Sequence, residues 1–153
     1  MDRRPPGRIL GLSLWLVLGL AALAVPRVVL HDLGTTAGPP AQALLAVGPP
    51  VVWVLVAVRA RVPSPVLTLV TVGALYGCAL ALTHNLLWNS AFTGDDPALG
   101  GALAGELDED TEEVLLRTAA TLSSIFTGMV LGLISGLVAT AIRQLTNRGR
   151  GSR

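Results

Sequence analysis

Cysteine, lysine and charge in general are scarce in this chain. Its 153 residues include a single cysteine, Cys78, so the chain can form no intramolecular disulfide and no cysteine metal site. Lysine is absent, and all 11 basic residues are arginine. Charged residues amount to 14% of the sequence, whereas about 25% is usual in soluble domains. The formal net charge of +1 excludes a strong electrostatic partner for the molecule as a whole, and we expect no binding to nucleic acid.

Motifs that carry chemistry are also missing. The sequence has no Ser-His-Asp or metalloprotease motif and no glycine-rich phosphate loop before a basic residue. Acidic residues alternate at Asp108, Asp110 and Glu112 as in a calcium loop, but Glu113 stands where that loop requires glycine. We therefore expect a protein that is not an enzyme and that holds no metal or cofactor.

Apolar residues, in contrast, are abundant. They make up 52% of the chain and gather in four stretches. A stretch of about 20 apolar residues can span a bilayer as a helix. The sequence therefore predicts an all-α integral membrane four-helix bundle, formed by a single domain over residues 1–146 and followed by a disordered basic tail over 147–153. The four transmembrane helices are expected at about 9–30, 41–58, 66–88 and 111–144.

The first two predicted helices each contain proline. The first follows basic residues, as a signal peptide does, but its apolar run is longer than a usual signal core. We interpret it as an uncleaved span bent at Pro26. The second is interrupted by Gly48-Pro49-Pro50 near its middle. Pro49 and Pro50 supply no backbone N–H, so we expect a break or a kink there, and a break at mid-membrane can mark a binding site.

Two stripes of small residues lie in the third and fourth predicted helices. The stripe in the fourth helix consists of Ser124, Gly128, Gly132, Gly136 and Thr140. The stripe in the third helix consists of Gly73, Gly77 and Ala81. In lipid, helices associate through close van der Waals contact, which small residues permit. The sequence therefore predicts that these two helices pack against each other, antiparallel, through their stripes.

The face on which each residue lies follows from a rotation of about 100° per residue. His84 lies about 20° from Gly73 around the helix, so we expect it on the packing face. Thr68 lies about 140° away from Gly73, and we expect it to face lipid. The stripe of the fourth helix drifts by roughly 40° at every fourth residue. One neighbour should therefore cover only part of that stripe, and we expect a second copy of the chain to pack on the rest.

Arginine is distributed unevenly between the segments that flank the four stretches. If the N-terminus is cytoplasmic, nine of the eleven arginines lie inside, and only Arg27 and Arg117 lie outside. Nine of the ten acidic residues lie outside, with Asp2 alone inside. Cytoplasmic segments of membrane proteins are rich in arginine and lysine. The sequence therefore predicts a multi-pass protein of the bacterial inner membrane with both termini in the cytoplasm.

Polar residues near the predicted outer ends of the helices form a candidate polar or ligand site. They are Arg27, His31, Asp32, His84, Asn85 and Arg117. Together they could bind a small anion or a lipid headgroup, although interfacial side chains of this kind often only pair with one another. At the start of the fourth helix we expect Asp110 to cap the helix, with Glu113 three residues later, and Glu113 to pair with Arg117.

These features predict a non-enzymatic interaction or accessory subunit. Its expected partners are the lipid bilayer and either a second copy of the chain or another membrane protein. A small oligomeric transporter or channel is one alternative, in which the segment Gly48-Pro49-Pro50 could act as a gate. A haem or quinone carrier that uses His84 is another, since an ionisable residue within a span is a functional candidate.

Overall fold

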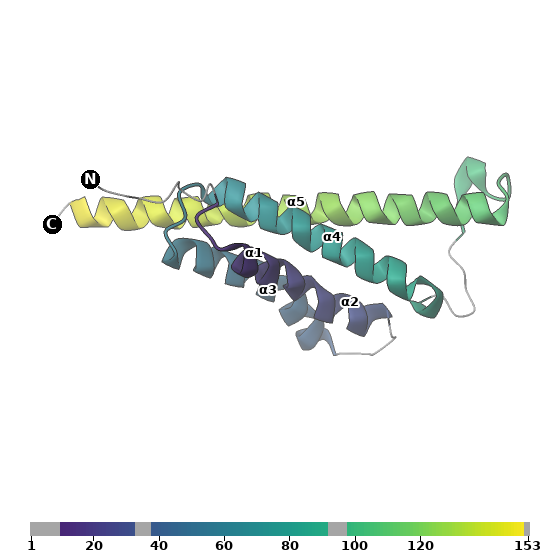
Figure 1. Ribbon diagram of the computed structural model, residues 1–153, viewed down its shortest axis with the longest axis horizontal. Coiled ribbons are helices and arrows are strands. Elements are labelled where there is room, and N and C mark those ends of the chain that lie inside the picture. The colour runs from purple at the N-terminus through teal and green to yellow at the C-terminus, as the bar shows by residue number, and fades with distance from the viewer. Residues whose placement is uncertain (1–9, 33–37, 92–97, 152–153) are drawn as a thin grey trace.

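The regular elements of the protein are all helical in the residues that the computed structural model describes, 10–32, 38–91 and 98–151 (Figure 1). The α-helices are α1 (Leu14–Ala21), α2 (Val25–Asp32), α3 (Pro39–Arg59), α4 (Pro65–Ala91) and α5 (Glu109–Gly151). Two short 3₁₀ helices are η1 (Ala22–Ala24) and η2 (Gly101–Leu103). The predicted all-helical class is confirmed for these residues.

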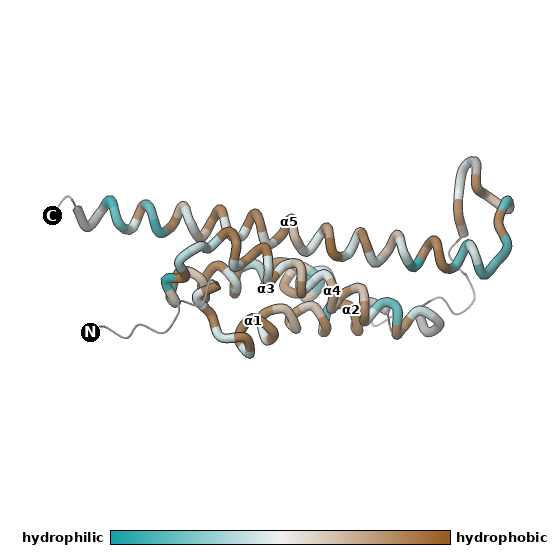
Figure 2. Tube along the Cα trace, turned by 45° about the horizontal axis from the view of Figure 1, so that its top comes forward, coloured by the Kyte–Doolittle hydropathy of each residue, from teal (hydrophilic) through white to brown (hydrophobic). Residues whose placement is uncertain are grey.

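Among the described residues, three helices are long and apolar enough to cross a membrane. They are Pro39–Arg59, Pro65–Trp88 and Glu109–Arg148, with mean hydropathy of 2.0, 2.0 and 2.1 over 18 residues. A shorter apolar helix covers Leu14–Leu30. Three long helices and one short helix therefore fit the predicted count of four. α5 extends along the whole molecule, and hydrophilic residues gather at its two ends (Figure 2).

The shorter helix begins later than predicted, because the Ser13 side chain accepts a hydrogen bond of 3.2 Å from Leu16 N and caps the helix there. η1 then interrupts the α-helical pattern just before Pro26. Proline has no N–H to donate to the carbonyl four residues back. The Ala22 carbonyl instead accepts from Val25 N in a tighter 3₁₀ bond. The irregularity expected at Pro26 therefore takes the form of a 3₁₀ turn just before it.

α3 continues as one helix through Pro49 and Pro50, so the break considered at these residues is absent, whereas the kink stays a prediction. Each proline removes only one N–H, and only the carbonyls of Leu45 and Ala46 lose their partner within the helix. The residues on either side remain helical. Pro49 is also buried, so packing against the rest of the molecule supports the helix at this position.

α4 packs mainly against α5, antiparallel to it, and the two backbones meet at the small-residue stripes. Gly73 lies against Gly128 and Gly132. Gly77 lies against Ser124, where an added Cβ atom would be 2.5 Å from the Ser124 carbonyl oxygen. A Cβ atom cannot approach a backbone so closely, so only glycine permits this separation of the helices.

α4 covers the α5 stripe along most of its length. Gly132 lies against the Leu69 backbone, and an added Cβ on Gly136 would be 2.6 Å from the Val66 Cα. Small residues on both helices let the backbones stay close over several turns, so one neighbour reaches from Ser124 to Gly136. α4 therefore covers more of the stripe than its drift around the helix predicted, and self-association of the chain stays a prediction.

Thr68 was expected to face lipid, and this expectation is wrong because the residue is fully buried. Its hydroxyl donates a hydrogen bond of 2.9 Å to Leu10 O, in the segment that leads into α1. Gly11 in the same segment has a φ of +66° and lies directly against Pro63. The leading segment therefore crosses the start of α4, which a helical wheel of α4 alone cannot reveal.

The two ends of the bundle carry opposite charges. Leu10, the α3–α4 connection over residues 60–64, and residues 140–147 of α5 meet at one end, which we call the basic end (Figure 1). Toward the other end, which we call the acidic end, Asn85 of α4 contacts Arg117 of α5, and α5 begins beyond this contact. The basic end carries Arg59, Arg61, Arg143 and Arg148. The acidic end carries Glu106, Asp108, Glu109, Asp110, Glu112 and Glu113.

The turn after α3 has an arginine where glycine is usual. α3 ends in a Schellman motif, in which Val62 N donates to Ala57 O and Arg61 N donates to Val58 O, both at 3.2 Å. This motif requires a left-handed residue after the cap, and Arg61 has a φ of +50°. That conformation costs a residue other than glycine roughly 1–2 kcal/mol. Arg61 is therefore held in the turn against its local preference.

α5 is longer than predicted at both ends. At its start the cap is Asp108 rather than Asp110, because the Asp108 carboxylate accepts from Thr111 N (3.0 Å) and Thr111 Oγ1 (2.8 Å). At its other end the helix continues to Gly151, whereas the sequence predicted a disordered tail from residue 147. No proline follows Pro97 to stop the helix, and a formed helix extends into residues that would not nucleate one.

Trp53 connects α3 to the rest of the core. It is fully buried, and its Nε1 donates a hydrogen bond of 3.1 Å to Leu20 O. Its ring meets the Tyr76 ring edge-on, with centroids 5.2 Å apart and planes at 84°. Tyr76 is 1% exposed, and its hydroxyl has no hydrogen-bond partner in the described part of the chain. A buried hydroxyl without a partner lowers stability.

Gly132→Ala is expected to lower the free energy of unfolding by about 1–3 kcal/mol, because the methyl group would collide with the Leu69 backbone. Gly19→Ala is the matched control, since no atom lies within 4 Å of that position. It should leave stability unchanged or raise it by up to about 1 kcal/mol, because alanine favours helix. Thermal unfolding in a mild detergent measures both. Equal midpoints for the two variants would contradict the α4–α5 contact.

Tyr76→Phe is expected to raise the free energy of unfolding by about 1 kcal/mol, because it removes a buried hydroxyl that lacks a partner. Thr68→Val also removes one buried hydroxyl, but that group is bonded to Leu10 O, so the same measurement should show a loss of similar size. A destabilised Tyr76→Phe variant would mean that the Tyr76 hydroxyl is bonded.

Candidate functional site

A small pocket lies between α2, α4 and α5, toward the acidic end. Its volume is about 230 Å³. We call it the histidine pocket, and the residues that line it are Arg27, Val28, Leu80, His84, Ser123, Ser124 and Thr127. It combines one guanidinium, one imidazole and three hydroxyl groups with two apolar side chains.

Each helix presents its part of the histidine pocket for a local reason. On α2, Val28 is only 2% exposed and anchors the helix, which leaves the neighbouring Arg27 exposed. On α4, His84 lies on the helix face that carries Gly77, and it lines the pocket together with residues of α5. On α5, Ser124 belongs to the small-residue stripe. The close approach of α4 and α5 therefore positions His84 beside the hydroxyl groups.

The donors around the histidine pocket fit a small anion or a hydroxylated group. Arginine is always charged and donates through a planar fork, while serine and threonine hydroxyls can donate or accept. None of the lining residues is a carboxylate. The volume of about 230 Å³ is below the roughly 300–1,000 Å³ usual for ligand and cofactor pockets. The described residues also include no group of three His, Cys, Asp or Glu that could hold a metal ion.

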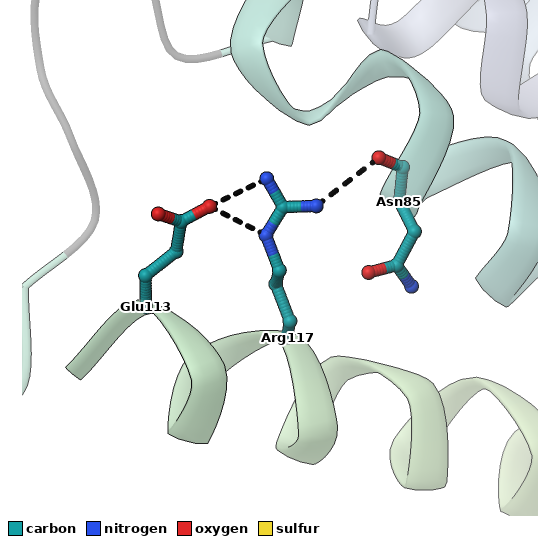
Figure 3. A network of polar contacts seen from close by, with 3 residues as sticks. All are labelled: Asn85, Glu113 and Arg117. Atoms are coloured by element: carbon teal, nitrogen blue, oxygen red, sulfur yellow. Dashed lines mark hydrogen bonds and ion pairs between the residues drawn. The ribbon is translucent and has the colours of Figure 1, made fainter. Parts of the chain in front are cut away.

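A second polar group lies nearer the acidic end and joins α4 to the start of α5 (Figure 3). Glu113 Oε1 accepts from Arg117 Nε at 2.6 Å and pairs with Arg117 Nη2 at 2.5 Å, so the pair predicted four residues apart is confirmed. Arg117 Nη1 also donates to the Asn85 carbonyl at 3.3 Å. The Asn85 amide donates to Thr121 Oγ1 at 3.1 Å, and the Arg117 guanidinium lies 4.9 Å from the Trp88 ring centroid.

This arrangement around Arg117 is suited to holding two helices together. The side chains of Arg117 and Glu113 are 29% and 44% exposed, so water screens their ion pair, which contributes about 0–1 kcal/mol by itself. The bonds to Asn85 and the contact with Trp88 add attachment across the helix interface. With its guanidinium engaged on three sides, Arg117 acts here as a structural link between α4 and α5.

The structure divides the predicted polar site into these two groups. Arg27 and His84 line the histidine pocket, whereas Asn85 and Arg117 belong to the network of Figure 3. His84 and Asn85 are neighbours in sequence, but consecutive helical residues point about 100° apart, which separates them. His31 and Asp32 lie in the last turn of α2, and their side chains are outside the described part of the structure.

Sequence reasoning missed several residues of these two groups. Ser123 and Thr127 line the histidine pocket, and Thr121 and Trp88 complete the network around Arg117. The available signal was the cluster of hydroxyl residues on the α5 face next to the glycine stripe. The pairing of Thr121 with Asn85 depends on the register of α4 against α5, which the stripes indicate only to within a turn.

The start of α5 positions Glu113 and Arg117 for this network. Thr111 donates from its hydroxyl and from its backbone N–H to Asp108, and these bonds lower the pKa of the Asp108 carboxyl below its usual 3.8. One turn further, Glu112 accepts a hydrogen bond from Leu99 N in the preceding connection. Carboxylates at a helix N-terminus also interact favourably with the helix dipole.

Comparison with known proteins adds no assignment to this arrangement. No protein family, curated protein or solved structure matches the chain. The function is therefore inferred from the chain itself. Its described part has apolar helices, unlike charges at the two ends of the bundle, and a polar pocket near each end.

Acidification is expected to weaken the first turn of α5. A carboxyl whose pKa is lowered in the folded protein stabilises the fold above its ordinary pKa, and this contribution disappears as the pH falls through the lower folded value. The hydrogen-exchange protection of the Thr111 amide should therefore fall below pH 3.8, the usual pKa of Asp108. Asp108→Asn keeps a capping oxygen but cannot titrate, so in this variant the protection of the Thr111 amide should not change over the same pH range. An equal loss in both proteins would assign the effect to another carboxylate.

Proposed function

We propose that the chain is a four-span protein of the bacterial inner membrane that acts as a non-enzymatic interaction or accessory subunit. In this proposal both termini are cytoplasmic, and the partner is another membrane protein or a second copy of the chain. The proposal rests on the surface of the helices and on the charges at the two ends of the bundle.

The observation that carries the proposal is the exposure of the apolar helices. Only 17%, 39% and 28% of the apolar windows of α3, α4 and α5 are buried inside the molecule. On α5, Leu122, Phe126 and Leu137 are 64%, 68% and 56% exposed. Soluble proteins rarely expose continuous apolar surfaces of this kind, whereas lipid tails or a partner helix would cover them.

The first helix can serve as the fourth span. Residues 14–32 form a continuous helical segment, which is about 28 Å long at a rise of 1.5 Å per residue. This length is close to the roughly 30 Å thickness of the hydrocarbon core. With four crossings, the lead into α1, the α3–α4 turn and the end of α5 all lie on one side of the membrane.

The charges at the two ends favour one orientation. The basic end contains Arg59, Arg61, Arg143 and Arg148, whereas the acidic end contains six carboxylates over residues 106–113. Segments rich in arginine remain in the cytoplasm during insertion. The basic end is therefore cytoplasmic in this proposal, and the histidine pocket lies toward the outer face.

The exposed faces of α3 and α5 are the surfaces that a protein partner would contact. α4 already occupies the glycine stripe of α5 from Ser124 to Gly136, so association of two copies would use a different face. Phe126 is the largest exposed apolar side chain near the middle of α5, and Leu55 is 48% exposed on α3. The transporter or channel and the haem or quinone carrier are the alternatives, and no contact in the described residues favours either one.

Cysteine labelling tests the orientation in a Cys78→Ser background. Ser64→Cys places a thiol in the turn at the basic end, and Ala104→Cys places one in the connection before α5, both at exposed positions. A membrane-impermeant maleimide should label Ala104→Cys in cells with a permeabilised outer membrane, and Ser64→Cys only after the inner membrane is opened. The reverse pattern would overturn the orientation. Recovery of the protein in the soluble fraction would overturn the membrane assignment.

Photo-cross-linking in native membranes tests the accessory role. Benzoylphenylalanine in place of the exposed Phe126 should give a discrete protein adduct, whose mass distinguishes a second copy from another protein. The same probe in place of Trp53, which is fully buried, should give only products within the chain. No protein adduct at Phe126 or at a second exposed position, Leu55, would mean that lipid covers these faces and that the accessory role is wrong.

A further inference from the structure

A larger pocket, which we call the arginine pocket, lies at the basic end between the α3–α4 turn and the last turns of α5. Its volume is about 550 Å³. The residues that line it are Val58, Arg59, Arg61, Arg143, Thr146 and Asn147. It is at the opposite end of the bundle from the histidine pocket, so the two sites are separate.

Positive charge in the arginine pocket is not balanced by its lining residues. Arg59, Arg61 and Arg143 contribute three guanidinium groups, and none of the six lining residues is acidic. The carboxylates whose side chains the structure describes lie over residues 106–113, at the acidic end. Like charges gathered in one pocket repel one another, and an anion between them would remove that repulsion. Thr146 and Asn147 add a hydroxyl and an amide that can donate to the same anion.

A bond to the backbone fixes the direction of Arg143. Arg143 Nη1 donates to Val62 O, which ties α5 to the turn that carries Arg59 and Arg61. This bond uses one N–H group of the guanidinium, which has five in total. α5 and the α3–α4 turn are therefore joined beside the pocket, and all three arginines keep N–H groups that can donate to a ligand.

The left-handed conformation of Arg61 is the strongest indication that its side chain is functional. The Schellman motif at the end of α3 needs a left-handed residue at this position, and glycine would adopt that conformation without strain. The chain has 17 glycines, yet it places an arginine with a φ of +50° here. A strained residue persists where its surroundings hold it, and such residues cluster at ligand sites.

We propose that the arginine pocket binds a phosphate group. Arginine recognises phosphate through paired charge-assisted hydrogen bonds, and three arginines with two neutral donors match an oxygen-rich anion of this kind. The phosphate can belong to the headgroup of an anionic lipid or to a free phosphate compound. The lipid source rests on the proposed membrane orientation, because basic pockets between helices on the cytoplasmic side bind such headgroups. Phosphate binding by itself does not depend on that orientation.

The test uses the full chain purified in a non-ionic detergent. Native mass spectrometry measures the binding of phosphatidylglycerol and of diacylglycerol, which has no phosphate, and calorimetric titration measures the binding of inorganic phosphate. The main variant is Arg59→Gln with Arg61→Gly, because glycine fits the left-handed position and keeps the turn. The control is Arg148→Gln, which removes one charge from the same end of α5 at a residue that does not line the pocket.

The expected result is preferential binding of phosphatidylglycerol. The affinity of the double variant should be at least about tenfold lower, because each lost hydrogen bond to a charged group removes a large part of the binding free energy. The unfolding midpoint of the double variant should stay the same or rise, and Arg148→Gln should bind as the wild type does. Binding of inorganic phosphate without a preference for the anionic lipid would assign the site to free phosphate compounds. Equal binding of both lipids without phosphate binding, or unchanged affinity in the double variant, would overturn the proposal.

Discussion

The contact between the backbones of α4 and α5 is the constraint on which the rest of the structure depends. Gly73 and Gly77 on one helix meet Ser124, Gly128 and Gly132 on the other with no room for a side chain between them. Dispersion forces fall off steeply with distance, so such close packing can hold two helices together where water does not drive them together. α1, α2 and α3 then add to this pair rather than forming a core of their own.

The polar features of the molecule lie toward the two ends of this pair. Toward the acidic end, α2 contributes Arg27 to a pocket formed by His84 and the hydroxyl groups of α5. At the basic end, the α3–α4 turn contributes Arg59 and Arg61 to a pocket completed by Arg143. In each case a segment from elsewhere in the chain lies beside α5 and completes the lining of a pocket. Glycine packing in the middle and polar sites at the ends are thus parts of one arrangement.

The charges at the two ends of the bundle link the proposed membrane orientation to the proposed phosphate site. The carboxylates at one end and the arginines at the other give the bundle a direction, which the proposed orientation in the membrane uses. In that orientation the arginine pocket lies at the level of the cytoplasmic headgroups, and the exposed faces of α3 and α5 lie among the lipid tails. A subunit held in this way would present Phe126 and Leu55 to a neighbour while the arginines hold a phosphate at the membrane surface.

The sequence by itself determined the features that follow from local pattern and composition. Apolar length set the helices, the four-residue spacing of Gly128, Gly132 and Gly136 marked the face that meets α4, and the distribution of arginine separated the two ends. Only the tertiary structure decided what lies against each remaining face. Thr68 is buried and bonded to Leu10 O, and Arg143 bonds to Val62 O across more than eighty positions of sequence. The spacing of residues along a helix gives the direction of each side chain around that helix. Whether the side chain is buried depends on which distant segment of the chain crosses that face, and no local pattern contains that information.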